Sequence, residues 1–411
     1  MIIRARIVVT MHEAPIENGA VAVSGNRIAD VGRFDAIKKR NAGNVVDLGE
    51  QALLPGLINA HCHLDYTCLR GKIPPQKSFT DWIKAINAEK SELSAKDYLA
   101  SINEGFKEAK RFGTTTIANL TAFPELISQL QPTIRTCWFA ELIDIRAPEH
   151  TNELVDSAIE SLRRARPKLL LSEVEAGAPW GLAPHALFTA SKDLFRRCEE
   201  TAQQESILLT THLAESREET QMFRDSSGPL YDFMKSIGRP MDDCGNGTPL
   251  GLFLGAPGGR AQENWIVAHL NEFSESDSDL LERSNSKFHV AHCPRSHNYF
   301  GHSPFAFDRL RSLGFNVCLG TDSLASNESL SLFAEMRAFQ KEFPSVPPEE
   351  ILKLVTVNPA RALRQQNALG QIRPGFGADL TAVPSSTSMD IFEQILAFDA
   401  PVSWTMVNGK M

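Results

Sequence analysis

The sequence predicts an α/β protein, a (β/α)8 TIM barrel with a small β-sandwich domain formed by both chain ends. Two observations predict this fold class. Short apolar runs alternate with longer segments of helical period through the middle of the chain, and short strand-like patterns occupy both of its ends. At 411 residues the chain is long enough for such a barrel and one smaller domain. We expect residues 1–54 and 368–411 to form the β-sandwich and residues 55–367 to form the barrel.

The N-terminal segment predicts a β-hairpin. Residues 1–10 and 19–32 alternate apolar with small or polar residues, and the dipeptide Gly25-Asn26 is typical of a hairpin turn. The C-terminal segment returns to short strand-like patterns. We therefore expect the two ends of the chain to pair in one domain.

Eight apolar runs follow Pro55 and predict the parallel strands of the barrel. They cover residues 57–63, 114–120, 134–143, 176–185, 206–212, 264–270, 287–293 and 314–321. Each is followed by a longer segment, and eight such units over roughly 300 residues match a (β/α)8 barrel.

Helical periodicity is clearest between the first and second of these runs, after Ser94. Ser94 followed by Asp97 resembles a capping box, and apolar residues then recur at spacings of three and four until Gly113. Similar helices are expected over residues 151–165 (with Thr151 as the cap), 190–204, 275–284 and 305–313. Residues 226–262, rich in Gly and Pro, predict a long loop insertion near the sixth strand.

Composition excludes several classes of partner. The formal net charge of −8 and the absence of a basic stripe argue against a nucleic-acid partner. No apolar run approaches the roughly 18 residues that span a membrane, and the N-terminal apolar stretch is too short for a signal peptide. Seven scattered cysteines without a CxxC pair are typical of buried thiols in a reducing compartment. We expect a cytoplasmic protein without a membrane partner, and leave open whether it is a homo-oligomer.

Two histidines end the first apolar run, in the stretch LINAHCHLDYT. Because side chains at i and i+2 of a strand point to the same face, His61 and His63 point together into the barrel at the strand's C-terminal end. Barrel enzymes carry their chemistry at that end. Paired neutral imidazoles are good ligands for a divalent ion, although two histidines in a polar loop are the alternative at this point.

Polar residues at other strand ends decide between these alternatives. His212 ends the fifth strand with Glu215 three residues on, His269 ends the sixth strand, and Asp322 ends the eighth. With the first histidine pair, His212 and Asp322 complete three nitrogen ligands and one oxygen ligand and leave room for a water, the open pattern of a catalytic site. Glu215 and His269 remain beside the metal as acid and base groups.

The ordered stretches PGLINAHCHLD, THLAESREE, VAHLNE, AHCPRSH and GTDSLASNESLSLFAEMR resemble the amidohydrolase superfamily, specifically its mononuclear-metal deaminase and chlorohydrolase branch. The similarity runs from about residue 45 to the C-terminus and includes VNPARAL and LGQIRPGFGADL. The resemblance implies metal ligands at His61, His63, His212 and Asp322, with Glu215, His269 and Asp322 as the catalytic residues.

The resemblance also bears on the number of metal ions. Binuclear relatives use a carboxylated lysine at the end of the fourth strand, where this chain offers His185. We therefore expect one divalent metal ion. The ligand set favours zinc, with iron or manganese as alternatives.

Within this branch the chain is similar to enzymes that deaminate adenine-type nucleosides. DYTCLRGKIPPQKSFTDW resembles their lid segment, in which Trp82 would cover the purine, and LAPHALF matches the stretch whose histidine, His185, faces the nucleoside. HLAES, CPRS and GTDSLAS favour aminodeoxyfutalosine as the substrate. Arg70 and Arg295 are candidates to bind its carboxylate, or could equally form salt bridges at the barrel rim.

Two other classes of function stay open. A hydrolase of another aromatic heterocycle, such as a guanine- or cytosine-type deaminase or a triazine chlorohydrolase, would share every catalytic residue. A noncatalytic barrel scaffold would be expected to have lost its metal ligands, whereas the set here is complete. We therefore expect a small-molecule heterocyclic substrate. Only the lid segment and His185 favour a nucleoside over other heterocycles.

Overall fold

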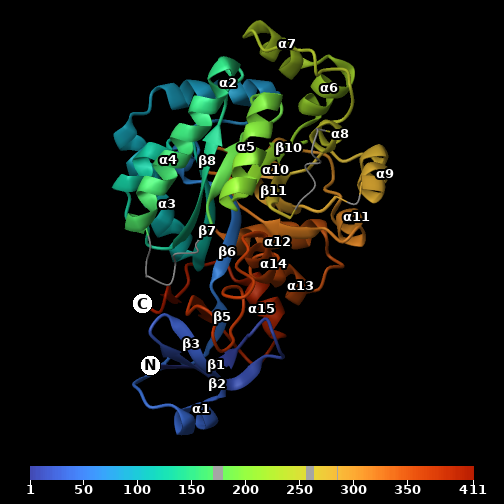
Figure 1. Cartoon of the computed structure of the whole chain (residues 1–411). Coiled ribbons are helices and arrows are strands. Elements are labelled where there is room, and N and C mark those ends of the chain that lie inside the picture. Colours follow the sequence, from blue (N-terminus) through green and yellow to red (C-terminus); the bar gives the residue numbers. More distant parts are fainter. Residues whose placement is uncertain (170–178, 256–262, 285) are drawn as a thin grey trace.

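The computed structural model describes residues 1–169, 179–255, 263–284 and 286–411 (Figure 1). It contains a parallel sheet surrounded by helices and, at one end of that sheet, a smaller mixed sheet. Among the described residues, no helix has the length and apolar character needed to cross a membrane.

The parallel sheet is TIM-barrel-like, as predicted. Its neighbouring strands follow the order β13-β12-β11-β10-β9-β8-β7-β6-β14. They are β6 (Leu57–His63), β7 (Thr114–Thr121), β8 (Arg135–Leu142), β9 (Gly181–Pro184), β10 (Leu208–Leu213), β11 (Trp265–His269), β12 (His289–His292), β13 (Asn316–Leu319) and β14 (Asp322–Ser323). The predicted strands correspond to these, except that residues 176–178 of the fourth lie outside the described residues.

The eighth strand closes this sheet on itself. It is split into β13, which pairs with β12, and β14, which pairs with β6. At the break, the Gly320 amide donates to the carbonyl of His292 (2.8 Å) and the Thr321 amide donates to the carbonyl of His61 (3.0 Å). A Cβ at Gly320 would lie 2.7 Å from the backbone oxygen of His61, so the two strands approach closely only because this residue is glycine.

Helices lie around the barrel strands (Figure 1). The longer ones are α2 (Phe79–Ser91), α3 (Ala95–Arg111), α4 (Thr151–Leu169), α5 (Lys192–Glu205), α6 (Arg217–Asp225), α7 (Pro229–Ser236), α9 (Glu275–Ser284) and α12 (Leu332–Glu342). The shorter ones are α8 (Pro249–Leu254), α10 (Pro294–Phe300), α11 (Phe307–Ser312), α13 (Pro348–Lys353), α14 (Val357–Ala362) and the 3-10 turns η1 (Leu64–Leu69), η2 (Pro124–Gln129) and η3 (Pro148–His150).

Local sequence signals explain where several of these helices begin. The predicted capping box of α3 is present, because Ser94 and Asp97 each accept a hydrogen bond from the other's backbone amide. Thr151 is not a cap as predicted. It lies within the first turn of α4, and its hydroxyl donates to the carboxylate of Asp144 (2.5 Å) and lies 2.7 Å from the carbonyl oxygen of Pro148.

The predicted loop insertion over residues 226–262 is wrong in part. Its described residues include the helices α7 and α8, and residues 256–262 lie outside the described part of the chain. Pro229 and Pro249 open these two helices. Proline is well tolerated at a first helical position, so a Pro-rich stretch is compatible with helix starts as well as with loops.

Both ends of the chain contribute to the smaller sheet, as predicted. Its described strands, in the order β16-β15-β5-β1-β2-β3 with β4 beside β1, are β1 (Ile2–Val8), β2 (Ile16–Ser24), β3 (Arg27–Arg33), β4 (Val45–Asp47), β5 (Gln51–Pro55), β15 (Leu380–Pro384) and β16 (Trp404–Met406). The hairpin turn lies at Gly25-Asn26, where Gly25 has a φ of 60°. Helix α1 (Phe34–Arg40) follows β3 in the chain, and helix α15 (Ile391–Ala397) lies between β15 and β16.

This sheet has a buried core of its own, formed by side chains such as Ile3, Leu53 and Leu380. A bridge between Arg27 and Gly377 joins β3 to the segment that leads into β15. The described strands belong to one mixed sheet, so a sandwich of two sheets stays a prediction. The sheet lies at the opposite end of the barrel from α2, α6 and α7 (Figure 1), which leaves the C-terminal ends of the barrel strands accessible to a ligand.

Candidate active site

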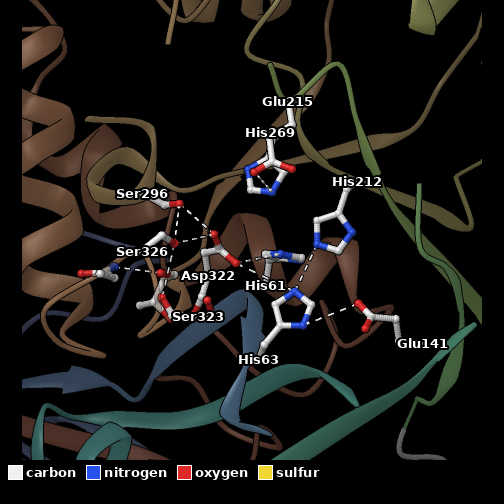
Figure 2. A network of polar contacts seen from close by, with 12 residues as sticks. His61, His63, Glu141, His212, Glu215, His269, Ser296, Asp322, Ser323 and Ser326 are labelled. Carbon is white, nitrogen blue, oxygen red and sulfur yellow. Dashed lines mark hydrogen bonds and ion pairs between the residues drawn. The ribbon is translucent and has the colours of Figure 1, made fainter. Parts of the chain in front are cut away.

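The six residues predicted from strand ends gather at the C-terminal end of the barrel (Figure 2). They are His61 and His63 of β6, His212 of β10, Glu215 just after β10, His269 at the end of β11 and Asp322 at the start of β14. All six are buried. Strands far apart in the sequence therefore bring one cluster of polar groups together.

The candidate ligand atoms lie in overlapping groups of three, which include His61 with His63 and Asp322, and His61 with His212 and His269. The Nε2 atoms of His63 and His212 lie 3.1 Å apart. Oδ1 of Asp322 lies 3.8 Å from Nε2 of His61 and 3.9 Å from Nε2 of His63. Ligand atoms separated by these distances can bind one ion, and this donor set of imidazole nitrogens and one carboxylate oxygen suits zinc.

The hydrogen-bond partners of His212 and Asp322 leave one possible metal-ligand atom of each directed toward the cluster. His212 uses Nδ1 to donate to the carbonyl of His185 (2.9 Å), so its Nε2 carries the lone pair. Oδ2 of Asp322 accepts from Ser296 (2.7 Å) and Ser326 (3.0 Å), which leaves Oδ1 facing the histidines. His61 buries both ring nitrogens without a hydrogen-bond partner among the described residues, an arrangement that a bound cation would satisfy.

Burial keeps the imidazoles in their neutral, metal-binding form. Desolvation lowers the pKa of His61, His63 and His269 well below the usual range, and neighbouring histidines lower it further. Neutral imidazole is the form that binds metal ions. The cluster is thus ready to bind a divalent ion at neutral pH.

Glu215 and His269 form a second pair at the edge of this cluster. Oε1 of Glu215 lies 3.7 Å from Nε2 of His269. Burial raises the pKa of Glu215 well above its usual range, and the charge of Asp322 contributes. Glu215 therefore holds a proton at a pH at which an exposed carboxyl would have lost it, and can donate that proton to a ligand.

The backbone at two of these positions lies in the left-handed region. His269 has a φ of 72° and Asp322 a φ of 55°. Such conformations cost about 1–3 kcal/mol for residues other than glycine and occur most often at functional sites. They lie at the end of β11 and at the start of β14, the two points where these strands contribute a side chain to the cluster.

Glu141, at the end of β8, is a member of the site that sequence reasoning missed. Its Oε1 lies 3.7 Å from Nδ1 of His63 (Figure 2). The same oxygen lies 4.0 Å from Nε2 of His185. Its position at the end of the third predicted strand was the available signal, because strand ends carry the other residues of the cluster. Ser296 and Ser326 had no such signal, since Ser296 lies in α10 and Ser326 in the segment after β14, and only the folded chain brings both hydroxyls to Asp322.

A pocket opens above the cluster, and its lining includes two residues predicted to bind substrate, Trp82 and His185. Trp82 belongs to α2, which forms one wall, and packs on Phe79 with ring centroids 6.0 Å apart. His185 follows β9, with Nδ1 hydrogen-bonded to the hydroxyl of Thr189 (2.7 Å). The pocket thus combines an aromatic wall with a few polar groups, as small-molecule sites commonly do.

Helix α2 is attached to the segment that carries Glu215. The carboxylate of Glu218 accepts hydrogen bonds from the amides of Phe79 (2.9 Å) and Thr80 (3.0 Å) and from the Thr80 hydroxyl. These amides belong to the first turn of α2, which has no partners for them within the helix. Glu218 therefore positions this wall of the pocket.

Neither predicted arginine lies in the pocket. The guanidinium of Arg70 pairs with Glu108 on the outside of the barrel. Arg295 donates to Ser329 (2.9 Å) and to Glu328 (2.9 Å). Of the two alternatives for these residues, the salt bridge at the rim is the one that the structure has.

Residues 52–411 match the amidohydrolase family. The chain belongs to this family. This amidohydrolase is 29% identical over 403 residues to a 5-methylthioadenosine/S-adenosylhomocysteine deaminase of Nitratidesulfovibrio vulgaris, an alignment that covers 93% of this chain and 83% of the relative.

Solved structures share the fold of this amidohydrolase. Helicobacter pylori aminofutalosine deaminase in complex with methylthio-coformycin superposes with a TM-score of 0.82 at 20% identity, covering 100% of this chain and 99% of that one. Atrazine chlorohydrolase of Arthrobacter aurescens TC1, complexed with zinc, gives a TM-score of 0.80 at 18% identity, covering 100% of this chain and 94% of that one.

Proposed function

We propose that this amidohydrolase is a metal-dependent hydrolytic deaminase of an adenine-type nucleoside. The observation that carries the proposal is the pairing of a neutral histidine and aspartate cluster with Glu215 in one pocket that an aromatic residue, Trp82, helps to line. The names of relatives that act on methylthioadenosine and aminofutalosine support the same reaction class.

The metal in this proposal is one divalent ion, held by His61, His63, His212 and Asp322. Zinc is favoured by the donor set and by its presence in a structural relative, with iron and manganese as alternatives. When bound, such an ion would activate a water molecule for attack, because it lowers the pKa of the water that it binds to about 7.

The protein's own residues then divide the proton transfers between them. Asp322 accepts a proton from the attacking water as the oxygen adds to the amidine carbon. Glu215 donates its proton to the adjacent ring nitrogen, which removes the negative charge that the addition creates. His269, 3.7 Å from Glu215, holds the water and polarises the attacked carbon. The carbon–nitrogen bond then breaks as Asp322 passes its proton to the amino group, which leaves as ammonia, and the added hydroxyl becomes the carbonyl as its proton returns to Glu215.

Placement of the substrate follows from the pocket walls. Trp82 would cover the purine, and His185 would face the sugar. Aminodeoxyfutalosine is the specific substrate we propose, although neither Arg70 nor Arg295 is placed to bind its carboxylate. A guanine- or cytosine-type deaminase and a triazine chlorohydrolase are the alternatives, the latter favoured by the structural similarity to atrazine chlorohydrolase.

A substrate panel tests this proposal. Initial rates of ammonia and chloride release are measured for the zinc-loaded protein with aminodeoxyfutalosine, adenosine, methylthioadenosine, adenosylhomocysteine, guanine, cytosine and one chlorotriazine. We expect the highest kcat/KM with one of the four nucleosides. A tenfold lead for guanine or cytosine would refute the nucleoside assignment, and chloride release without ammonia would refute deamination.

A further inference from the structure

Lys90 is a cation that lines the active-site pocket and that the proposed mechanism does not use. It is half-buried in the last turn of α2, on the helix face that also presents Trp82, Ile83 and Asn87 to the pocket. Every other Lys or Arg of the described residues lies outside this lining. At about 1.5 Å per residue, Lys90 lies roughly 12 Å along the helix from Trp82.

The surroundings of Lys90 hold its ammonium in place without neutralising it. The Nζ atom lies 4.5 Å from the centroid of the Tyr66 ring, a cation–π contact. Tyr66 in turn stacks on His63, with ring centroids 5.9 Å apart. Among the described residues, no carboxylate lies within 4 Å of this ammonium, and no group accepts a hydrogen bond from it. A partly desolvated cation without an ion-pair partner attracts an anion strongly.

Charges elsewhere in the pocket restrict where an anion can bind. The carboxyl groups of Asp322, Glu215 and Glu141 line the same pocket and lie beside the metal-binding histidines. An anionic group of the ligand would be repelled there and attracted toward the wall formed by Lys90. The Asn87 side chain, one turn earlier on the same helix face, offers a further hydrogen-bond donor.

We propose that Lys90 determines specificity for a substrate whose sugar-side substituent carries an anionic group, a carboxylate or a phosphate. The proposal rests on the proposed deaminase function, in which the heterocycle lies beside Glu215 and Trp82. The substituent then extends along α2, and the ammonium of Lys90 binds its anionic end. This gives Lys90 the role that sequence reasoning offered to Arg70 and Arg295.

Lys90 could instead have one of two structural roles, and each predicts a different result from recognition of an anionic ligand. A lysine in the last turn of a helix stabilises it through the helix dipole, and a cation near Glu141 offsets the charge of that carboxylate. Either role would affect all ligands equally. Discrimination between matched ligands that differ in charge alone therefore isolates the recognition role.

The experiment uses 5′-(carboxyethylthio)-5′-deoxyadenosine, its neutral carboxamide and adenosine 5′-monophosphate. The kcat/KM of the zinc-loaded protein and the Kd of the metal-free protein are measured for the wild type and for Lys90→Met, Lys90→Arg and Lys84→Met. Lys84 is the matched control, since it lies on the same helix and pairs with Asp81 outside this pocket.

We expect the wild type to prefer the carboxylate or the monophosphate over the carboxamide by about tenfold, the effect of one charge-assisted hydrogen bond. The preferred anion identifies whether carboxylate or phosphate is the natural group. Lys90→Met should abolish the preference, Lys90→Arg should restore part of it, and Lys84→Met should keep it.

Equal losses for the anionic and neutral compounds in Lys90→Met, or no preference in the wild type, would overturn this inference. Turnover of nucleosides without discrimination would leave the deaminase proposal intact. Absence of turnover for every nucleoside, with charge discrimination still present in the Kd of the metal-free protein, would refute the deaminase proposal and support the anion-binding role.

Discussion

Protonation of Glu215 is the residue-scale feature on which the proposed chemistry depends. Burial and the nearby Asp322 raise its pKa, so the carboxyl holds a proton in the folded protein. Since the acid acts in its protonated form, kcat/KM should fall as the pH rises through the raised pKa of Glu215. The same proton also stabilises the fold, and this stabilisation is lost as the pH rises through that pKa.

Replacing Glu215 with Gln removes the transferable proton and keeps the size of the side chain. We expect kcat to fall at least about a hundredfold and the alkaline limb of the pH profile to disappear, while metal content by elemental analysis stays unchanged. Loss of metal together with activity would instead make Glu215 a ligand, and retained activity would assign the proton transfer to another group.

Ser296 is predicted to act on the metal through Asp322. Its hydroxyl donates to Oδ2 of Asp322 (2.7 Å), and groups that orient a metal ligand typically contribute about 10–100-fold to affinity. Ser296→Ala should weaken zinc binding by that order, measured by competition with a chelating dye. Ser303→Ala, a variant of a serine whose hydroxyl bonds to Glu272 instead, is the control. Equal affinities in the two variants would refute the role.

At this scale the sequence predicted the residues that lie at strand ends, because strand direction alone places them. His61 and Asp322 could be found without knowing any contact. Ser326 and the partners of the two arginines, Glu108 of α3 and Glu328, could not, since these contacts depend on how the segments around the barrel strands fold and pack.

Helix α2 is the element whose position affects the pocket most directly. Glu218 of α6 accepts hydrogen bonds from its first amides, whereas Ser78 caps the same helix locally by accepting from Asp81. Loss of either cap should lower the free energy of unfolding by about 1 kcal/mol.

Only Glu218, however, joins α2 to the segment that carries Glu215. Glu218→Ala should therefore raise KM for the nucleoside several-fold, whereas Ser78→Ala should leave KM close to that of the wild type. Parallel denaturant unfolding confirms that both variants fold. An equal KM in the two variants would show that the attachment of α2 by Glu218 does not shape the pocket.

Strands were predicted better than the insertions between them. Most described residues of the barrel strands are buried, and parallel strands covered on both faces have a continuous apolar sequence. The insertion after residue 226 has no such constraint, and there Pro229 and Pro249 begin helices. A proline signals a break in regular structure, but both a loop and a new helix can begin at that break.

For the whole molecule, the sequence predicted a barrel joined to a smaller domain by both chain ends. Arg135, at the start of β8, makes a contact between them through its ion pair with buried Asp379 (2.8 Å). The closure of the barrel between β6 and β14 could not be derived from the runs themselves, because it depends on the close approach of Gly320 to His61.

The most direct test of the central claim is a titration of metal-stripped protein with zinc while ammonia release from the best 6-aminopurine nucleoside is recorded. We expect no release without metal, then a linear rise with added zinc, and a plateau at one zinc per chain. His61→Ala should show no rise at any ratio. Ammonia release by the stripped protein would contradict metal dependence, and a plateau only at two ions per chain would contradict a single metal site.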